Sequence, residues 1–318
     1  MLKTIESKSP SAHDLMSNIE KVVKGKRDSV ELSIITLLAR GHLLIEDVPG
    51  VGKTTLAYSL AKSVHCDFKR IQFTSDLLPS DILGVSIYDT HRQEFHFNKG
   101  PIFTNIALAD EINRTTPKTQ SSLLEVMERG KVSIDSSTYD LPQPFMVIAT
   151  QNPVDYEGTF PLPRSQMDRF LMRIEMGYPD QSHELDILKY NRRNYSEIPI
   201  DPIATPEQIM EMQAKVEEVH ISDEIYDYVL KLIHFTRSGE FFEMGVSPRG
   251  GLALCHAAQS CAYVSGRDFV TPDDIKRLIK PVFSHRVVLK NRRSSDDPHL
   301  RETNELLDRI LSSVPPPP

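Results

Sequence analysis

Short apolar runs alternate with helical patterns between about residue 42 and residue 176. Several of these runs are almost continuously apolar, which is typical of strands that are covered on both faces of a sheet. Strand and helix patterns that alternate in this way predict a parallel sheet with crossover helices. The five predicted strands are residues 42–46, 69–73, 106–110, 145–150 and 170–174.

The second half of the chain has a different pattern, because strand signals fade after Pro179 and helix starts follow one another. Three of these starts place a capping hydroxyl before a proline at the first helical position. A fourth start is Ser222, which precedes two acidic residues and an apolar set with helical spacing, and Gly266 ends the helix that begins at Pro248. The three Ser/Thr-Pro starts are Thr205-Pro206, Ser247-Pro248 and Thr271-Pro272. The pattern predicts an all-helical second domain.

These patterns divide the chain into four parts. Residues 1–41 are predicted to form a helical lead-in, and residues 42–178 an α/β domain. Residues 179–311 are predicted to form a smaller helical domain, and residues 312–318 a proline-rich tail. At ~100–200 residues per domain, the length of 318 residues agrees with this two-domain organisation.

Composition narrows the class of protein. The chain has 37 basic and 44 acidic residues, a formal net charge of −7, which argues against a protein wrapped in nucleic acid. The apolar run at 32–39 is far shorter than the ~20 residues that span a bilayer, and charges stand where a signal peptide would have its apolar core. Three cysteines without C-x-x-C spacing predict buried thiols in a reducing compartment. We therefore expect a cytoplasmic protein without a membrane span.

A glycine-rich segment between a predicted strand and a predicted helix, residues 46–54, nearly matches the phosphate-binding pattern G-x-x-x-x-G-K-[ST]. Gly50 and Gly52 would let backbone N–H groups close on phosphate oxygens. Lys53 would reach the β- and γ-phosphates, and Thr54 would hold Mg²⁺ at the start of the helix. Asp47 stands where the pattern has its first glycine, and we expect its side chain to point away from the phosphates. The segment predicts a nucleotide site.

Polar side chains end two of the other predicted strands. Asp110 and Glu111 follow the apolar run 106–109, where Asp110 would hold Mg²⁺ and Glu111 would polarise the water that attacks the γ-phosphate. Asn152 follows the run 145–150 and would orient that water. An asparagine that caps a turn before Pro153 is the alternative for Asn152.

Arginines near the domain boundary are candidates to complete the site. Arg169 leads into the last predicted strand and could reach a γ-phosphate bound by a neighbouring subunit, with Arg164 and Arg173 as competitors. A surface ion pair is the alternative reading of these side chains. Arg249 lies in the first turn of a predicted helix of the second domain, from which it could project toward the nucleotide held by the first.

Taken together, these residues make the chain resemble a MoxR-family AAA+ ATPase of the helix-2-insert branch. The resemblance runs from about residue 22 to residue 289, and its motifs occur in one order. It implies a P-loop AAA+ core with a five-stranded parallel sheet, followed by a smaller helical lid domain. The most specific segments are Gly41-His42, residues 48–54, Lys99-Gly100-Pro101-Ile102-Phe103, residues 109–114, Pro117-Lys118-Thr119-Gln120, Thr150-Gln151-Asn152-Pro153, residues 157–163 and Asp168-Arg169-Phe170.

The resemblance implies a role for each matching position. Asp110 and Glu111 would form Walker B, Asn152 sensor 1, Arg169 the arginine finger and Arg249 sensor 2. The Walker A and neighbouring nucleotide contacts would be Pro49, Gly50, Val51, Gly52, Lys53, Thr54 and Thr55, with Val23 and Gly25 near the adenine. The family insert would lie within 81–99 and a hairpin at 131–141. Similar proteins usually carry glutamate at the position of Arg164, which leaves the choice of finger open.

The function that these residues and the resemblance imply is ATP hydrolysis, with Mg²⁺, coupled to the remodelling or maturation of a protein client. Similar proteins work as rings, so we expect a homo-oligomer, a hexameric ring by analogy, with a von Willebrand factor A domain protein as partner. The alternatives are a metal-chelatase motor subunit, a nucleic-acid motor or loader, and a nucleotide-gated scaffold without hydrolysis. The charge of −7 counts against nucleic acid, and the intact set Lys53, Thr54, Asp110, Glu111 and Asn152 counts against the scaffold.

Overall fold

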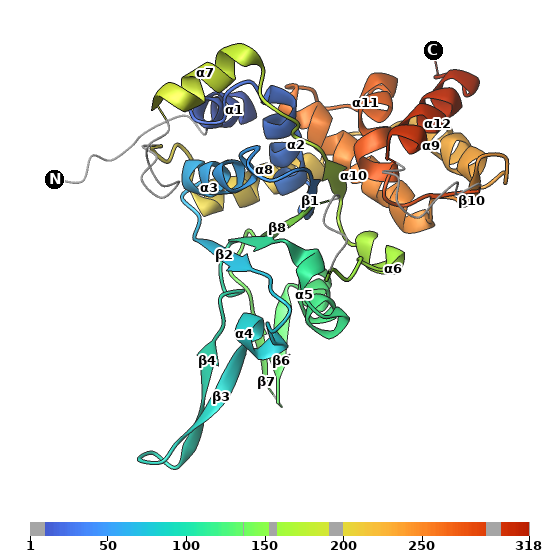
Figure 1. Ribbon diagram of the computed structural model, residues 1–318. Helices are drawn as coiled ribbons and strands as arrows, with labels where there is room; N and C mark the ends of the chain where they lie inside the picture. The colour runs from blue at the N-terminus through green and yellow to red at the C-terminus, as the bar shows by residue number, and fades with distance from the viewer. Residues whose placement is uncertain (1–9, 136, 153–157, 191–199, 291–299, 318) are drawn as a thin grey trace.

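The computed structural model of the chain describes residues 10–135, 137–152, 158–190, 200–290 and 300–317. Three residues of the predicted motifs and tail, Pro153, Glu157 and Pro318, lie outside this part, as do residues 1–9 of the predicted lead-in. Figure 1 shows a central sheet with helices around it, a helical domain to one side and two hairpins that extend away from the sheet.

The central sheet has five parallel strands in the order β2-β5-β8-β1-β9. Each strand lies within two residues of its predicted position, and the parallel α/β core is confirmed. Strand β5 is buried along its whole length, which is why its sequence is apolar up to its last residue. The strands are β1 (Leu43–Glu46), β2 (Phe68–Gln72), β5 (Ile106–Asp110), β8 (Met146–Gln151) and β9 (Met172–Ile174).

Register places the polar strand ends beside one another. Glu46 at the end of β1 pairs with Gln151 of β8, and Gln72 at the end of β2 pairs with Asp110 of β5. All of these residues end parallel strands, so their side chains gather at the carboxyl edge of the sheet. In open α/β sheets this edge is where ligands bind.

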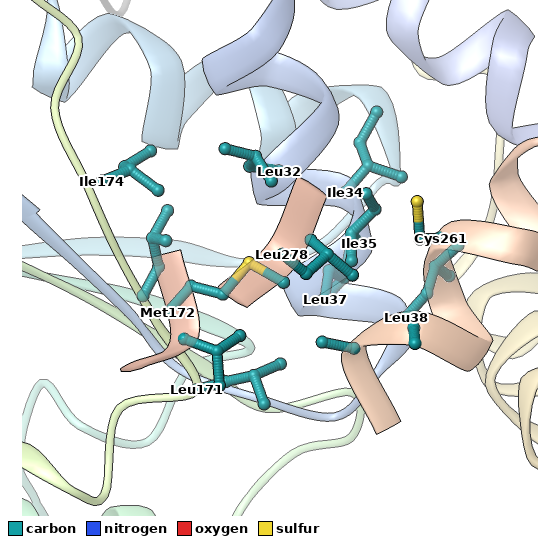
Figure 2. Close-up of a cluster of buried hydrophobic side chains, with 14 of the residues drawn as sticks. Leu32, Ile34, Ile35, Leu37, Leu38, Leu171, Met172, Ile174, Cys261 and Leu278 are labelled. Carbon is teal, nitrogen blue, oxygen red and sulfur yellow. The ribbon is translucent and has the colours of Figure 1, made fainter. Parts of the chain in front are cut away.

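The lead-in helices belong to the core and do not form a separate element. Helix α1 (Ala12–Glu20) begins at a capping box on Ser11, and α2 (Arg27–Leu38) is buried almost all round. Apolar side chains of α2 pack against β9 on one side and against two helices of the second domain on the other (Figure 2). The buried hydroxyls of Ser33 and Thr36 donate to carbonyls one turn earlier in α2, so they remain hydrogen-bonded. Helix α2 therefore joins the two domains through one apolar core.

The second domain is built from the helices that the sequence predicts. Their starts are confirmed, because Thr205, Ser222, Ser247 and Thr271 are the N-cap residues of four helices. Gly266 follows the end of α10 with a positive φ of 76°, which ends that helix as expected. The helices are α7 (Gln181–Tyr190), α8 (Pro206–Glu217), α9 (Asp223–Thr236), α10 (Pro248–Val264), α11 (Pro272–Phe283) and α12 (Leu300–Ser313).

Two details of the second domain correct the prediction. It is not entirely helical, because β10 (Phe242–Met244) and β11 (Val288–Leu289) form a small antiparallel sheet. Strands of two and three residues are too short for an alternating pattern to reveal them. Helix α12 continues to Ser313, and Val314 is buried in the core, so the described tail begins later than residue 312.

Two hairpins lie on the side of the sheet away from the second domain (Figure 1). The first follows α4 (Pro79–Leu83) and pairs β3 (Gly84–Asp89) with β4 (Glu94–Lys99), within the predicted insert. The second pairs β6 (Lys131–Ile134) with β7 (Ser137–Asp140), within the hairpin that the resemblance implies at 131–141. The hairpins meet where Phe97 stacks on Tyr139, with ring centroids 4.5 Å apart. Further elements of the first domain are a 3₁₀ turn at Ile112–Arg114, the 13-residue helix α5 (Pro117–Arg129) and the short helix α6 (Arg164–Met167).

The three cysteines, Cys66, Cys255 and Cys261, are buried and unpaired, as predicted. Burial raises the pKa of Cys66 and Cys261 to about 12 and that of Cys255 to about 11, so all three stay protonated near neutral pH. Among the helices that the structure describes, none combines the length and the apolar character needed to cross a bilayer.

Acid is expected to destabilise the protein through His42. Its Nδ1 accepts from the Val147 backbone N–H at 3.0 Å and its Nε2 lies 2.9 Å from the Met127 carbonyl oxygen, in a buried site. Burial lowers the pKa of His42 to about 4 from 6.5. The unfolded chain therefore binds a proton that the folded chain excludes, and stability present above about pH 6.5 is lost as the pH falls toward 4.

From this one side chain, the free energy of unfolding should drop by about 2 kcal/mol between pH 7.5 and pH 5. Chemical denaturation at the two pH values measures the drop. It should be smaller in His42→Gln and unchanged in His91→Gln, because His91 is exposed on the first hairpin. An equal drop in all three proteins would contradict the assignment to His42.

Candidate nucleotide-binding site

The loop between β1 and α3 (Lys53–Ser63) has the conformation that its glycines permit. Gly50 and Gly52 have φ values of 84° and 96°, in the left-handed region that side chains disfavour. The space around both is open, so the requirement for glycine comes from the backbone and not from crowding. Gly52 is the N-cap of α3 and supplies no side-chain cap, which leaves the first turn of α3 as a place for an anion.

The loop opens into a cavity of about 350 Å³ at the carboxyl edge of the sheet. The cavity brings together six of the nine predicted nucleotide contacts with both predicted Walker B residues and Asn152. Val51 is instead buried in the core, and Val23 and Gly25 lie between α1 and α2, outside the lining of this cavity. The lining residues are Pro49, Gly50, Gly52, Lys53, Thr54, Thr55, Arg70, Asp110, Glu111 and Asn152.

Lys53 points its ammonium group back at the loop that precedes it. Its Nζ donates to the carbonyl oxygens of Asp47 at 2.6 Å and Val48 at 3.3 Å. Burial lowers the pKa of Lys53, while the nearby carboxylates of Asp47, Asp110 and Glu111 oppose that shift. The cavity therefore holds a partly desolvated cation beside the first turn of α3, which favours a phosphate ligand.

Asp110 is buried at the end of β5, and both of its carboxylate oxygens are occupied. Thr150 Oγ1 on β8 donates to Oδ1 at 2.6 Å. Arg70 on β2 donates to Oδ2 from Nε at 3.0 Å and from Nη2 at 2.6 Å. The neighbouring strands thus fix the carboxylate at the edge of the cavity.

Glu111 has an unusual backbone conformation, with φ 58° and ψ 51° in the left-handed region. For a residue other than glycine this costs on the order of 1–3 kcal/mol, and such strain often marks functional sites. The Glu111 N–H donates to Thr150 Oγ1 at 2.9 Å, which holds the turn. The carboxylate accepts from Gln72 Nε2 at 2.8 Å and forms an ion pair with Arg114 Nε at 3.3 Å. These contacts keep the carboxylate against the cavity.

Comparisons with known proteins agree with this geometry. The profile of the ATPase family associated with various cellular activities (AAA) matches residues 42–172, and the AAA lid domain profile matches residues 234–310. The chain is 38% identical over 307 residues to the chaperone MoxR1 of Mycobacterium tuberculosis, which covers 93% of this chain and 80% of that protein.

The chain belongs to the MoxR family of AAA+ ATPases.

Two further relatives extend the comparison across most of this MoxR-family chain. The uncharacterized protein YeaC of Bacillus subtilis is 50% identical over 274 residues, 86% of each chain. A crystal structure of a candidate ATPase from Cytophaga hutchinsonii superposes with a TM-score of 0.85 at 36% identity, covering 96% of this chain and 94% of that one. Both the P-loop core and the lid therefore have the family fold.

The four predicted arginines lie apart from the cavity of their own chain. Arg173 forms a 2.7 Å ion pair with Glu46 in which both side chains are only 12% exposed, and Arg164 Nη1 donates to the Val287 carbonyl oxygen at 2.6 Å. Arg169 and Arg249 both form ion pairs with Glu128 on α5, each at 3.1 Å. Arg249 was expected to point at the nucleotide site of its own chain, but it lies at Glu128 and does not line the described cavity.

Sequence reasoning missed three residues of this MoxR-family site: Arg70, Gln72 and Thr150. Arg70 and Gln72 stand two positions apart on β2, so they share a face, and Arg70 Nη2 also donates to Gln72 Oε1 at 2.8 Å. Paired polar residues near the end of a predicted strand were the available signal. Thr150 belonged to the segment Thr150-Gln151-Asn152-Pro153, but its contacts were not predicted, because a threonine at the end of an apolar run is also typical of an ordinary strand.

Asp47 occupies the position of the first P-loop glycine without entering the lining of the cavity. Its Oδ2 accepts from the backbone N–H groups of Met176 at 2.7 Å and Gly177 at 2.6 Å, and its Oδ1 accepts from Val48 N at 2.8 Å. The side chain therefore ties the loop to the segment after β9. The expectation that it points away from the loop interior fits these contacts.

Replacing Asp47 by alanine is expected to lower the free energy of unfolding by about 2–3 kcal/mol, because buried backbone donors lose a charged acceptor. Chemical denaturation measures this loss. Asp227→Ala, at an exposed position on α9, should change stability by less than about 0.5 kcal/mol. Equal stability of the two variants would show that the contacts of Asp47 do not hold the loop.

Proposed function

We propose that this chain hydrolyses ATP with Mg²⁺ in the cavity at the carboxyl edge of its sheet. The observation that carries the proposal is that the phosphate-binding loop, Asp110, Glu111 and Asn152 line one cavity. A phosphate chain on the first turn of α3 would meet the backbone N–H groups of the loop and the Lys53 ammonium group.

Thr54 and Asp110 suit Mg²⁺, since both line the cavity and both offer oxygen ligands. When bound, the ion would neutralise charge on the β- and γ-phosphates. Arg70 occupies Asp110 Oδ2 in this structure, so Mg²⁺ would bind Asp110 through a water or in place of that ion pair.

Glu111 would act as the general base. Its carboxylate lines the cavity, and Gln72 and Arg114 orient it, so it can accept a proton from a water aligned with the γ-phosphate. Asn152 would orient the same water through its side-chain amide. Proton transfer to a held carboxylate and charge stabilisation by Lys53 together account for the chemistry.

A neighbouring subunit would complete each site. Arg164 and Arg173 are engaged inside their own chain, whereas Arg169 and Arg249 meet at a partly exposed carboxylate outside their own cavity. We therefore assign Arg169 as the finger and place Arg249 with it, both acting on a nucleotide of the next copy. Contacts of this head-to-tail kind close into rings, and the MoxR resemblance favours a hexamer.

Remodelling of a protein client is the work that we propose for the ring. The relative named as a chaperone, MoxR1, supports it over the chelatase and nucleic-acid alternatives. Exposed Tyr88 and Phe95 on the first hairpin offer an apolar contact for a client or for a von Willebrand factor A domain partner.

The experiment that tests the reaction is a phosphate-release assay on the purified chain. We expect ATP turnover that stops when EDTA removes Mg²⁺, and specific activity that rises with protein concentration as subunits assemble. Binding of labelled ATP without any phosphate release, at concentrations where oligomers form, would contradict the proposal and favour a nucleotide-gated scaffold.

A further inference from the structure

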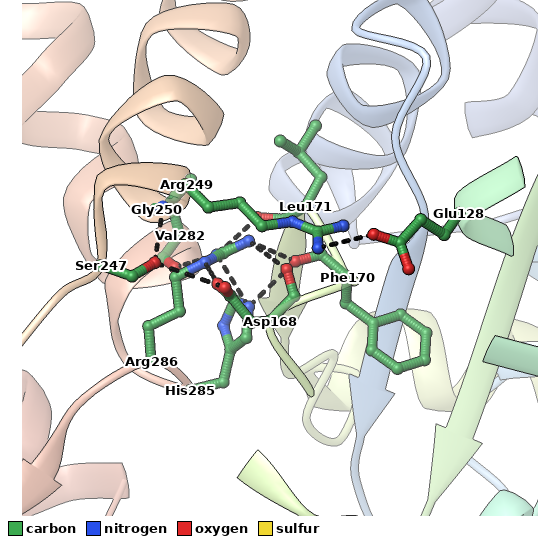
Figure 3. A network of polar contacts seen from close by, with 10 residues as sticks. All are labelled: Glu128, Asp168, Phe170, Leu171, Ser247, Arg249, Gly250, Val282, His285 and Arg286. Carbon is green, nitrogen blue, oxygen red and sulfur yellow. Dashed lines mark hydrogen bonds and ion pairs between the residues drawn. The ribbon is translucent and has the colours of Figure 1, made fainter. Parts of the chain in front are cut away.

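A buried arginine joins the lid to the segment that carries Arg169 (Figure 3). Arg286 lies in the turn after α11, and its side chain is 2% exposed. Its Nε donates to Asp168 Oδ1 at 2.6 Å, and its Nη2 donates to the carbonyl oxygens of Phe170 at 2.6 Å and Asp168 at 3.2 Å. The guanidinium group thus donates hydrogen bonds to the backbone on both sides of Arg169.

Further contacts anchor Arg286 itself. Its Nη1 donates to the carbonyl oxygens of Leu171, at 3.1 Å, and Val282. Burial lowers the pKa of Arg286 to about 10, so the group is still charged near neutral pH. Taking an ion pair out of water is costly, and a well-packed apolar pair is often as stable, so stability alone is a weak reason for this arrangement.

The second oxygen of Asp168 reaches the helix that carries Arg249. Ser247 Oγ donates to Asp168 Oδ2 at 3.3 Å, and the same hydroxyl caps α10 by accepting from Gly250 N at 3.2 Å. Arg249 stands in the first turn of α10. One carboxylate therefore connects the segment of Arg169 with the helix start of Arg249, and Arg286 holds that carboxylate.

The two arginines converge on a single anion in this chain. Arg169 Nη2 lies 3.1 Å from Glu128 Oε2, and Arg249 Nη1 lies 3.1 Å from Glu128 Oε1. Two guanidinium groups at this spacing can share one carboxylate, and a phosphoryl group presents the same kind of oxygen anion. The relative position of the two arginines depends on how the lid packs on the core, and the contacts of Arg286 contribute to that packing beside the apolar core around α2.

We propose that Arg286 is a positioning residue that acts through Asp168 to set Arg169 and Arg249 as a pair for one phosphate of a nucleotide on a neighbouring copy. This inference rests on the proposed function, in which those arginines act between subunits. Arg286 touches no nucleotide itself. Loss of the Arg286 side chain should misplace Arg169 and Arg249 of the same subunit, which act on the next copy. The nucleotide cavity of that subunit should stay intact.

The test uses Arg286→Lys in the full-length chain, which keeps the charge and loses the forked contacts. We expect kcat to fall by about 10- to 100-fold with KM within about threefold, since orientation in the transition state is lost while nucleotide binding is not. Arg267→Lys is the matched control, because Arg267 forms a similar pair with Asp274 at the other end of α11. The control should keep the turnover of the wild type. Unchanged kcat in Arg286→Lys would overturn the inference.

Mixing then separates positioning from general support of the fold. Lys53→Ala subunits keep their arginines and lack a working nucleotide loop, so they should complete the intact cavity of Arg286→Lys subunits. Random mixing would restore up to about a quarter of wild-type turnover, because about a quarter of the head-to-tail contacts join an intact cavity to intact arginines. If mixing with Lys53→Ala brings no gain in turnover to Arg286→Lys while an Arg169→Ala mixture recovers, Arg286 only supports its own subunit and the inference fails.

If neither mixture recovers, the assignment of the arginines to a neighbouring site fails, and the inference fails with it. Asp168→Asn provides a second variant should Arg286→Lys not fold, with folding monitored by thermal unfolding. It keeps the shape of the carboxylate and loses the charge that holds Arg286. We expect several-fold loss of kcat and the same recovery on mixing, and wild-type turnover in this variant would overturn the inference.

Discussion

Replacing Glu111 by glutamine is expected to lower ATP turnover by about 10²- to 10⁴-fold and to leave ATP binding intact. Glutamine keeps the size of the side chain and its place against the cavity, but its amide cannot accept a proton from the attacking water. The phosphate-binding loop and Asp110 are untouched by the change. Phosphate release and the affinity for labelled ATP, measured on the same preparation, test both halves of the prediction.

Glu217→Gln is a suitable control for this variant. Glu217 forms an exposed ion pair with Arg40, at 3.0 Å, at the end of α8 and away from the cavity. The Glu217→Gln variant should hydrolyse ATP at the rate of the wild type. Turnover in Glu111→Gln equal to that of this control would remove Glu111 from the reaction and leave the source of the general base to be reassigned.

Replacing Arg169 by alanine is expected to reduce turnover by about 10³-fold or more, the effect typical of an arginine finger. The affinity for ATP should stay within about threefold, because Arg169 does not line the described cavity of its own chain. The same phosphate-release and binding assays apply.

Arg129→Ala provides the comparison for Arg169. Arg129 is the last residue of α5, the helix that also carries Glu128, and it pairs with Glu125 along the exposed face of that helix. Loss of the Arg129 charge should leave turnover within about twofold, since exposed pairs on a helix contribute little. A loss of ATP affinity in Arg169→Ala, as large as its loss of turnover, would indicate that Arg169 contacts nucleotide within its own subunit.

Much of the fold follows from local sequence patterns. The apolar run that becomes β5 is buried on both faces, so its pattern is continuous and unambiguous. The helix starts at Thr205, Ser247 and Thr271 combine a capping hydroxyl with proline, and both preferences come from the geometry of the first turn. The phosphate-binding loop is predictable for a similar reason, because Gly50 and Gly52 have positive φ values that other residues disfavour.

Long-range contacts account for what the sequence could not predict. Asp47 accepts from backbone groups at Met176 and Gly177, far along the chain, and no local pattern links these positions. Arg249 was correctly placed in the first turn of α10, but the direction in which it points depends on how the lid packs on the core. That packing runs through α2 and Arg286, neither of which belongs to a nucleotide-binding motif.

In the proposed function, an arginine from the neighbouring copy completes each ATP site. Mixing Lys53→Ala with Arg169→Ala protein, each inactive alone, distinguishes this arrangement from one in which Arg169 acts within its own subunit. Lys53→Ala subunits would supply Arg169 to the intact cavities of their partners, so the mixture should regain up to about a quarter of wild-type turnover. A mixture that stays inactive, although mixed oligomers are shown to form, would contradict this arrangement and indicate that Arg169 acts within its own subunit.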